Sequence, residues 1–230
     1  MAILITKDLC KTYGSGDNAV HALNHVSLTV EEGEFVSIVG TSGSGKSTFL
    51  NLVGGLDKPT SGEVWVRGHD LGKLNDEQLT IFRRRNIGFV FQNFNLIPML
   101  NVYENITFTL EADGLRPDKE FLDGIIHALG LEEKRYTMPD QLSGGQQQRV
   151  AIARALATKP AMILADEPTG NLDSKTGLEV ALLLQNSVRK FGQTLIMITH
   201  NEELAQLADR ILHIEDGRIL GKEGDHVPHP

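Results

Sequence analysis

The chain has 230 residues, with 22 Lys and Arg against 30 Asp and Glu, which gives a formal net charge of -8. Hydrophobic residues make up 40% and charged residues 23%, a composition that excludes disordered and collagen-like chains. The negative charge argues against a nucleic-acid partner bound through a broad basic face. The single cysteine, Cys10, excludes an internal disulfide. Because no apolar run approaches the roughly 18 residues that span a bilayer and no signal peptide is visible, we expect a cytoplasmic chain.

In the first third of the chain, the residue pattern predicts strands at 26–30 and 35–39. A helix is predicted at 46–53. A second helix begins at Asn75, where Gln78 three residues later completes a capping box. Residues 87–91 alternate between apolar side chains and others, which predicts a further strand.

The middle of the chain, 93–156, is expected to be mostly helix and loop, with one helix at 121–129 that stops at Gly130. The last third returns to short apolar strands at 161–165 and 194–199, separated by a helix that has Val180, Leu184 and Val188 on one face. Asp216-Gly217 predicts a hairpin turn between strands at 211–214 and 218–220. Strands that alternate with helices predict an α/β fold with a mostly parallel sheet, interrupted by a helical insertion.

The segment at 40–48, Gly-Thr-Ser-Gly-Ser-Gly-Lys-Ser-Thr, fits the pattern G-x-x-x-x-G-K-[ST] at every fixed position. Its glycines let backbone N–H groups converge on phosphate oxygens, and the helix that follows adds partial positive charge. We expect Lys46 to reach the β- and γ-phosphates and the Ser47 hydroxyl to bind Mg²⁺. The alternative is a flexible Gly/Ser turn. The predicted nucleotide-binding residues are Gly40, Ser42, Gly43, Ser44, Gly45, Lys46, Ser47 and Thr48.

The apolar strand at 161–165 ends in two adjacent carboxylates, Asp166 and Glu167. Unpaired charge beside a core is costly, and a Mg²⁺-nucleotide would account for it. We expect Asp166 to hold the metal shell and Glu167 to polarise a water for attack on the γ-phosphate. Taken alone, the same pattern also fits ordinary surface acids at a strand end.

Residues 142–146, Leu-Ser-Gly-Gly-Gln, precede a predicted helix, for which Ser143 could serve as an ordinary N-cap. Together with the two segments above, they resemble the signature of ATP-binding-cassette (ABC) ATPases. The start of this helix makes a second anion site. The resemblance implies that Ser143, Gly144, Gly145 and Gln146 complete the ATP pocket of the opposite subunit in a head-to-tail homodimer.

The resemblance assigns four further residues one at a time. Tyr13 resembles the aromatic residue that stacks on adenine. Gln92 resembles the loop glutamine that touches Mg²⁺ and the attacking water. Asp173 resembles a residue of the loop that crosses the dimer interface, and the resemblance counts it among the nucleotide-binding residues. His200 resembles the histidine that hydrogen-bonds the γ-phosphate. The implied cofactors are ATP and Mg²⁺; the implied catalytic residues are Glu167, His200 and Gln92, and the implied metal ligands are Ser47, Gln92 and Asp166.

The resemblance covers nearly the whole chain and implies the fold. It predicts a P-loop NTPase ABC cassette with a RecA-like core at about 1–92 and 157–221 and an N-terminal antiparallel β subdomain. A helical subdomain is inserted at about 93–156, and a tail follows at 222–230. All of this is expected to form a single ABC ATPase domain, 1–230.

Segments at 54–62, 92–98 and 165–173 look like the MacB/LolD/FtsE type of this family. They imply an ATPase homodimer at the inner face of the membrane that drives a separately encoded permease, in export or mechanotransmission. One alternative is a regulatory ATPase that controls a cell-envelope enzyme through a membrane partner. A second is an ABC ATPase acting on DNA or ribosomes, which the absence of a heptad pattern between Lys46 and Ser143 disfavours. Apolar residues at 94–100 fit either a groove for a membrane partner or ordinary packing.

Overall fold

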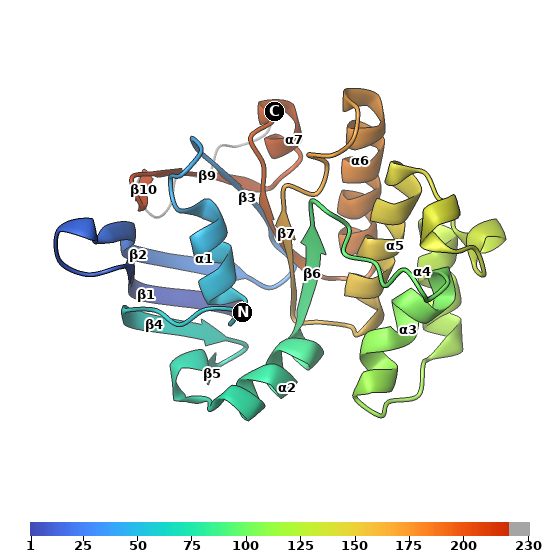
Figure 1. Cartoon of the computed structure of the whole chain (residues 1–230), viewed down its shortest axis with the longest axis horizontal. Coiled ribbons are helices and arrows are strands. Elements are labelled where there is room, and N and C mark those ends of the chain that lie inside the picture. Colours follow the sequence, from blue (N-terminus) through green and yellow to red (C-terminus); the bar gives the residue numbers. More distant parts are fainter. Residues whose placement is uncertain (221–230) are drawn as a thin grey trace. The chain divides into compact units, whose positions relative to one another are not determined.

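The computed structural model describes residues 1–220 (Figure 1), so the predicted tail at 222–230 lies outside the described residues. Contacts divide the chain into two compact units, Met1–Arg83 with Ile196–Pro230, and Arg84–Leu195. Within residues 1–220, no helix is both long and apolar enough to cross a membrane. Short 3-10 helices occur at Gly16–Asn18, Leu71–Lys73, Glu132–Lys134 and Pro139–Gln141.

The first unit contains an antiparallel sheet in the order β2-β1-β4-β5 (Figure 1). Its strands are β1 (Ala2–Tyr13), β2 (Val20–Glu31), β4 (Ser61–Val66) and β5 (His69–Asp70). Leu4 of β1 pairs with Val30 on one side and Val66 on the other, and all three side chains are fully buried. The alternation of side chains between the two faces of β1 is interrupted between Thr6 and Leu9. There the pairing register with β2 shifts, and Asp8 takes a positive φ of 53°.

A second group of strands in the first unit has the order β10-β9-β3-β8. These strands are β3 (Phe35–Val39), β8 (Thr194–Ile198), β9 (Arg210–Glu215) and β10 (Arg218–Leu220); of β8, residues 196–198 belong to this unit. β3 and β9 are parallel, and β3 is buried along its whole length. The predicted hairpin between β9 and β10 is confirmed, and both of its turn residues, Asp216 and Gly217, have positive φ.

Three helices accompany these strands. Helix α1 (Lys46–Val53) has the predicted bounds, follows β3 and packs its buried Phe49 and Leu50 face toward the antiparallel sheet. Helix α2 (Asp76–Asn86) begins at the predicted capping box: Asn75 Oδ1 accepts from the Gln78 N–H at 2.9 Å, and Gln78 Oε1 accepts from the Asn75 N–H at 3.1 Å. Helix α7 (Glu202–Ala205) contacts β3.

The second unit is built around one helix, α5 (Gly144–Ala157), which contacts α3 (Val102–Ala112), α4 (Lys119–Ala128) and α6 (Ser174–Lys190). It also contacts β6 (Ile87–Phe91), which pairs in parallel with β7 (Met162–Asp166). Residues 150–153 of α5 are all fully buried, as expected for a helix that is covered on several sides. The mixture of antiparallel and parallel strands with helices confirms the predicted α/β class.

Buried polar side chains hold the loop before α3. Asn105 is fully buried; its Oδ1 accepts from the Ile97 N–H at 2.8 Å, and its Nδ2 donates to Leu100 O at 2.7 Å. Arg154 donates to Phe94 O at 3.0 Å and Asn95 O at 2.6 Å. These side chains satisfy backbone groups that no strand or helix pairs.

The apolar residues at 94–100 were expected either to line a groove for a membrane partner or to pack within the chain, and they differ in burial. Phe94, Leu96, Ile97 and Leu100 are half-buried, so packing accounts for part of the stretch. Met99 is 83% exposed and does not belong to the core.

We predict that Asn105→Ala lowers the free energy of unfolding by about 1–3 kcal/mol, because loop groups such as the Ile97 N–H and the Leu100 carbonyl lose their buried partner. Urea unfolding followed by circular dichroism measures this loss. The matched control is Asn186→Ala on the exposed face of α6, which we expect to change stability by less than about 0.7 kcal/mol. Equal effects of the two substitutions would contradict the structural role of Asn105.

Candidate nucleotide-binding site

The glycine-rich loop at 40–45 connects β3 to α1 in the first unit. Gly40 and Gly45 have φ of 152° and 105°, and a Cβ atom on either would lie 2.1 Å from Ile214 O or 2.3 Å from Ala22 O. Close approach of neighbouring backbone therefore requires glycine at both positions. Gly43 has φ of 79° but open space around it. At this position glycine is favoured only by the positive φ and not by a close neighbour.

Helix α1 begins without a side-chain cap, because its N-cap residue is Gly45. Among the α-helices of residues 1–220, α1 alone lacks such a cap. The capping residues of the others are Asn75, Asn101, Asp118, Ser143, Asp173 and Asn201. The partial positive charge of the α1 N-terminus is therefore not offset by a side-chain oxygen of its own.

Lys46 adds a full positive charge at this helix start. The residue is 8% exposed, and its Nζ donates to Gly40 O at 2.9 Å and Thr41 O at 2.7 Å. The Gly217 N–H donates to Ser44 O at 2.9 Å, which ties the loop to the β9–β10 turn. The loop thus combines a backbone fixed by hydrogen bonds with one buried ammonium, an arrangement suited to an anion.

His200 lies two residues after the end of β8 at Ile198. It lines a cavity of about 480 Å³ together with Gly40, Thr41 and His213. The first unit therefore brings the predicted histidine and the start of the glycine-rich loop to the same cavity, although they are far apart in sequence.

Tyr13 lies at the end of β1 and is 43% exposed. Its hydroxyl donates to Asp57 Oδ2 at 2.8 Å, and its side chain lies close to Thr48 in the first turn of α1. Burial and the Asp57 carboxylate raise the pKa of Tyr13. The predicted aromatic residue thus lies beside the predicted phosphate-binding loop.

In the second unit, Gln92 and Asp166 emerge at the same edge of the sheet, because Phe91 of β6 and Asp166 of β7 are register partners. The Gln92 Nε2 donates to Asn171 Oδ1 at 2.9 Å, and Asn171 Nδ2 donates back to Gln92 O at 3.1 Å. Asn171 orients Gln92, a role that the sequence analysis missed. The sequence pattern offers no signal for it, since the two residues are 79 positions apart.

Glu167 has a left-handed φ of 49° and precedes Pro168, an uncommon conformation for a non-glycine residue. The Gly170 N–H donates to Glu167 O at 2.9 Å and closes the turn. Holding such a conformation costs about 1–2 kcal/mol, so the surrounding turn must enforce it. Within residues 1–220 there is no cluster of three or more His, Cys, Asp or Glu that could hold a metal. The predicted ligands Ser47 and Asp166 nevertheless offer a hydroxyl and a carboxylate oxygen. Such donors suit Mg²⁺, which proteins commonly bind through one or two carboxylates plus substrate phosphates.

Ser143 and Asp173 each have a local structural role. Ser143 caps α5 by accepting from the Gln146 N–H at 3.3 Å, while Gln146 Oε1 accepts from the Ser143 N–H at 2.9 Å. Asp173 caps α6, and its hydrogen bonds from Thr176 lower its pKa. The N-cap interpretation of Ser143 is correct, and it leaves the proposed nucleotide role of both residues as a prediction.

The family profile described as ABC transporter matches residues 23–170, which include the glycine-rich loop, the Ser143 segment and the Asp166-Glu167 pair. The chain belongs to the ABC transporter family.

Three relatives illustrate the membership. An uncharacterized ABC transporter ATP-binding protein of Methanocaldococcus jannaschii, MJ0796, is 48% identical over 94% of this chain and 95% of its own length. The lipoprotein-releasing system ATP-binding protein LolD of Geobacter metallireducens is 46% identical over 95% of this chain and 98% of its own. The macrolide export ATP-binding/permease protein MacB of Hyphomonas neptunium is 46% identical, and the match spans 34% of its length.

A solved structure of MJ0796 is described as dimeric, in a post-hydrolysis state bound to ADP and Pi. It matches 96% of this chain and 97% of its own, with a TM-score of 0.83 and 46% sequence identity. The ABC cassette fold that the sequence predicted is confirmed by this match.

We predict that Gly45→Ala destabilises the loop far more than Gly43→Ala. Both substitutions force a positive φ on alanine, at about 1–2 kcal/mol. At position 45 the new methyl group also collides with Ala22 O, which adds about 1–3 kcal/mol of overpacking. Urea unfolding and binding of a fluorescent ATP analogue report the two effects, and equal losses at both positions would contradict the geometry.

Proposed function

We propose that this chain is the ATP-binding and ATP-hydrolysing subunit of an ABC transporter, acting as a homodimer on membrane permease subunits. The observation that carries the proposal is the glycine-rich loop of the first unit, where α1 starts without a side-chain cap and the buried Lys46 ammonium donates back to the loop. The family membership and the relative's structure with ADP and Pi support the same function.

The glycine-rich loop would hold the phosphates, with the backbone N–H groups of residues 42–48 and the Lys46 ammonium neutralising their charge. Ser47, Asp166 and Gln92 would hold Mg²⁺, which when bound lowers the negative charge that the reacting phosphates present. Tyr13 would stack on the adenine base, since its half-exposed ring lies beside the loop.

Glu167 would accept a proton from the attacking water, because it directly follows the Asp166 strand end and is held by its own tight turn. Gln92 would orient that water, and its amide is held in one direction by Asn171. His200 would hydrogen-bond the γ-phosphate. Its place beside Gly40 and Thr41 in the first unit supports this assignment.

Two chains would share each nucleotide. Ser143, Gly144, Gly145 and Gln146 of one chain would clamp the phosphates bound by Lys46 of the other, and Asp173 would lie in the loop that crosses the interface. The dimeric structure of the relative supports this arrangement. ATP binding would then close the dimer and hydrolysis would reopen it.

The permease would be a separate chain, and the ATPase would lie in the cytoplasm at the inner face of the membrane. The support is that two relatives named as ATP-binding proteins match over 95% and 98% of their own length. We further propose one ABC ATPase domain over 1–230, with a core at about 1–92 and 157–221 and a helical insertion at about 93–156.

For Glu167→Gln, we predict retained ATP binding and ATP-dependent dimerisation, with hydrolysis slowed by about 10²–10⁴-fold because the amide cannot take the proton. Phosphate release and analytical ultracentrifugation with MgATP measure the two properties. The exposed Glu179→Gln in α6 is the control and is expected to hydrolyse ATP normally. Normal turnover by the Glu167 variant would exclude Glu167 as the base.

Replacing Ser143 with aspartate separates its two roles. Aspartate caps a helix as well as serine does, so Ser143→Asp is expected to leave stability unchanged, whereas Ser143→Ala loses about 1 kcal/mol. The added carboxylate would repel phosphate, so Ser143→Asp is expected to abolish ATP-dependent dimerisation in a Glu167→Gln background, as measured by ultracentrifugation. If the Ser143→Asp chains still dimerise with ATP, Ser143 is a helix cap and nothing more.

A further inference from the structure

The Asp57 carboxylate joins its own loop to the end of β1 at the edge of the proposed nucleotide site. One carboxylate oxygen, Oδ1, accepts from Lys11 Nζ at 2.7 Å and from the Lys58 N–H at 2.7 Å. The other, Oδ2, accepts from the Tyr13 hydroxyl at 2.8 Å. Burial opposes the ionisation of Asp57, but the hydrogen bonds from Lys11 and Tyr13 outweigh it and lower its pKa.

The Lys11 side chain is also fixed, by burial and by two hydrogen bonds of its ammonium group. Its side chain is 12% exposed, and its Nζ donates to Lys58 O at 2.7 Å as well as to Asp57. The same Nζ lies 4.8 Å from the centroid of the Tyr13 ring. A cation at that distance lies over one face of the ring, while Tyr13 as a whole is 43% exposed.

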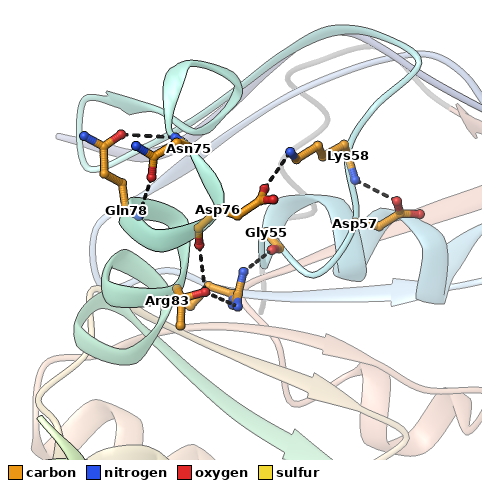
Figure 2. Close-up of polar contacts among 8 residues, drawn as sticks. Gly55, Asp57, Lys58, Asn75, Asp76, Gln78 and Arg83 are labelled. Atoms are coloured by element: carbon orange, nitrogen blue, oxygen red, sulfur yellow. Dashed lines mark hydrogen bonds and ion pairs between the residues drawn. The ribbon is translucent and has the colours of Figure 1, made fainter.

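The loop that carries Asp57 is itself fixed to its surroundings. The Asp57 N–H donates to Asn51 O at 3.3 Å in α1, and Arg83 donates to Gly55 O at 2.8 Å. Figure 2 shows this loop beside the start of α2, where Lys58 also forms a 2.7 Å ion pair with Asp76. Both side chains of that ion pair are exposed, so it contributes little to stability. The side chains of Lys11 and Asp57 are much less exposed.

We infer that Asp57, with Lys11, is a positioning residue for nucleotide binding: the pair holds the half-exposed Tyr13 ring beside the phosphate loop, where the purine base can stack on it. A free tyrosine side chain would have to give up its rotational freedom when the base binds. A ring held beforehand has already lost that freedom, so more of the stacking energy appears as affinity. The inference rests on the proposed function.

The test compares binding of MgATP with binding of magnesium tripolyphosphate, which carries the same phosphate chain but no base. Isothermal titration calorimetry is run on the Glu167→Gln chain, so that hydrolysis does not interfere. We expect Asp57→Ala to weaken MgATP binding by about two- to tenfold, the range for losing one ordering hydrogen bond, and to leave tripolyphosphate binding unchanged. Asp57→Asn keeps an acceptor for the Tyr13 hydroxyl and is expected to restore part of the affinity.

Asp76→Ala is the matched control, since it removes a carboxylate that contacts the same loop without touching Tyr13. It is expected to change neither affinity. In a Tyr13→Ala background, Asp57→Ala is expected to have no further effect on MgATP.

Loss of tripolyphosphate binding in Asp57→Ala would overturn the inference, because the residue would then support the phosphate loop in general. An unchanged MgATP affinity in Asp57→Ala would also overturn it, provided that Tyr13→Ala weakens MgATP. If the parent chain binds MgATP no better than tripolyphosphate, or if Tyr13→Ala has no effect, the assignment of Tyr13 fails and the inference falls with it. If Asp57→Ala does not fold, the partial loss expected for Asp57→Asn decides in its place.

Discussion

The start of helix α1 is the constraint on which the rest of the proposed site depends. The chain has a net charge of -8, which repels a polyanion such as ATP. The attraction for the phosphates therefore has to come from positive charge close to them. Gly45 in place of a capping side chain leaves the positive end of the helix open, and Lys46 adds a charge that is nearly buried. Adjacent backbone holds the loop in place, through the close approach of Ile214 O to Gly40 and the bond from Gly217 to Ser44.

The other α-helices of residues 1–220 show the opposite arrangement, since each begins with a side chain that accepts from its first turn. This matters most for Ser143 and Asp173, which the family resemblance places at the nucleotide and the dimer interface. Their capping bonds fix the start of α5 and of α6 within one chain. In the proposed dimer, the same two helix starts would face the partner's nucleotide, so the capping residues would be structural and functional at once.

Much of the fold could be predicted from residue patterns. Strand β3 and helix α1 were placed at their observed bounds, because a buried apolar run and a glycine-rich loop with Lys46 leave few alternatives. Strand β1 was missed, since the shift between Thr6 and Leu9 interrupts its alternation. For the candidate site, the motifs pointed to specific residues, whose roles stay predictions, but they gave no role to Asn171, Asp57 or Lys11. Their roles arise from contacts between segments far apart in sequence, which no local pattern records.

The central claim is that each ATP is bound between two copies of this chain, and mixing two defective variants tests it most directly. Lys46→Ala and Ser143→Asp chains, both with Glu167→Gln, are expected to form no ATP-bound dimer alone. A mixed dimer has one site that combines an intact Lys46 with an intact Ser143 from the other chain. Ultracentrifugation with radiolabelled ATP should therefore show dimers that retain a single nucleotide only in the mixture. A mixture that behaves as the sum of its separate components would contradict the account.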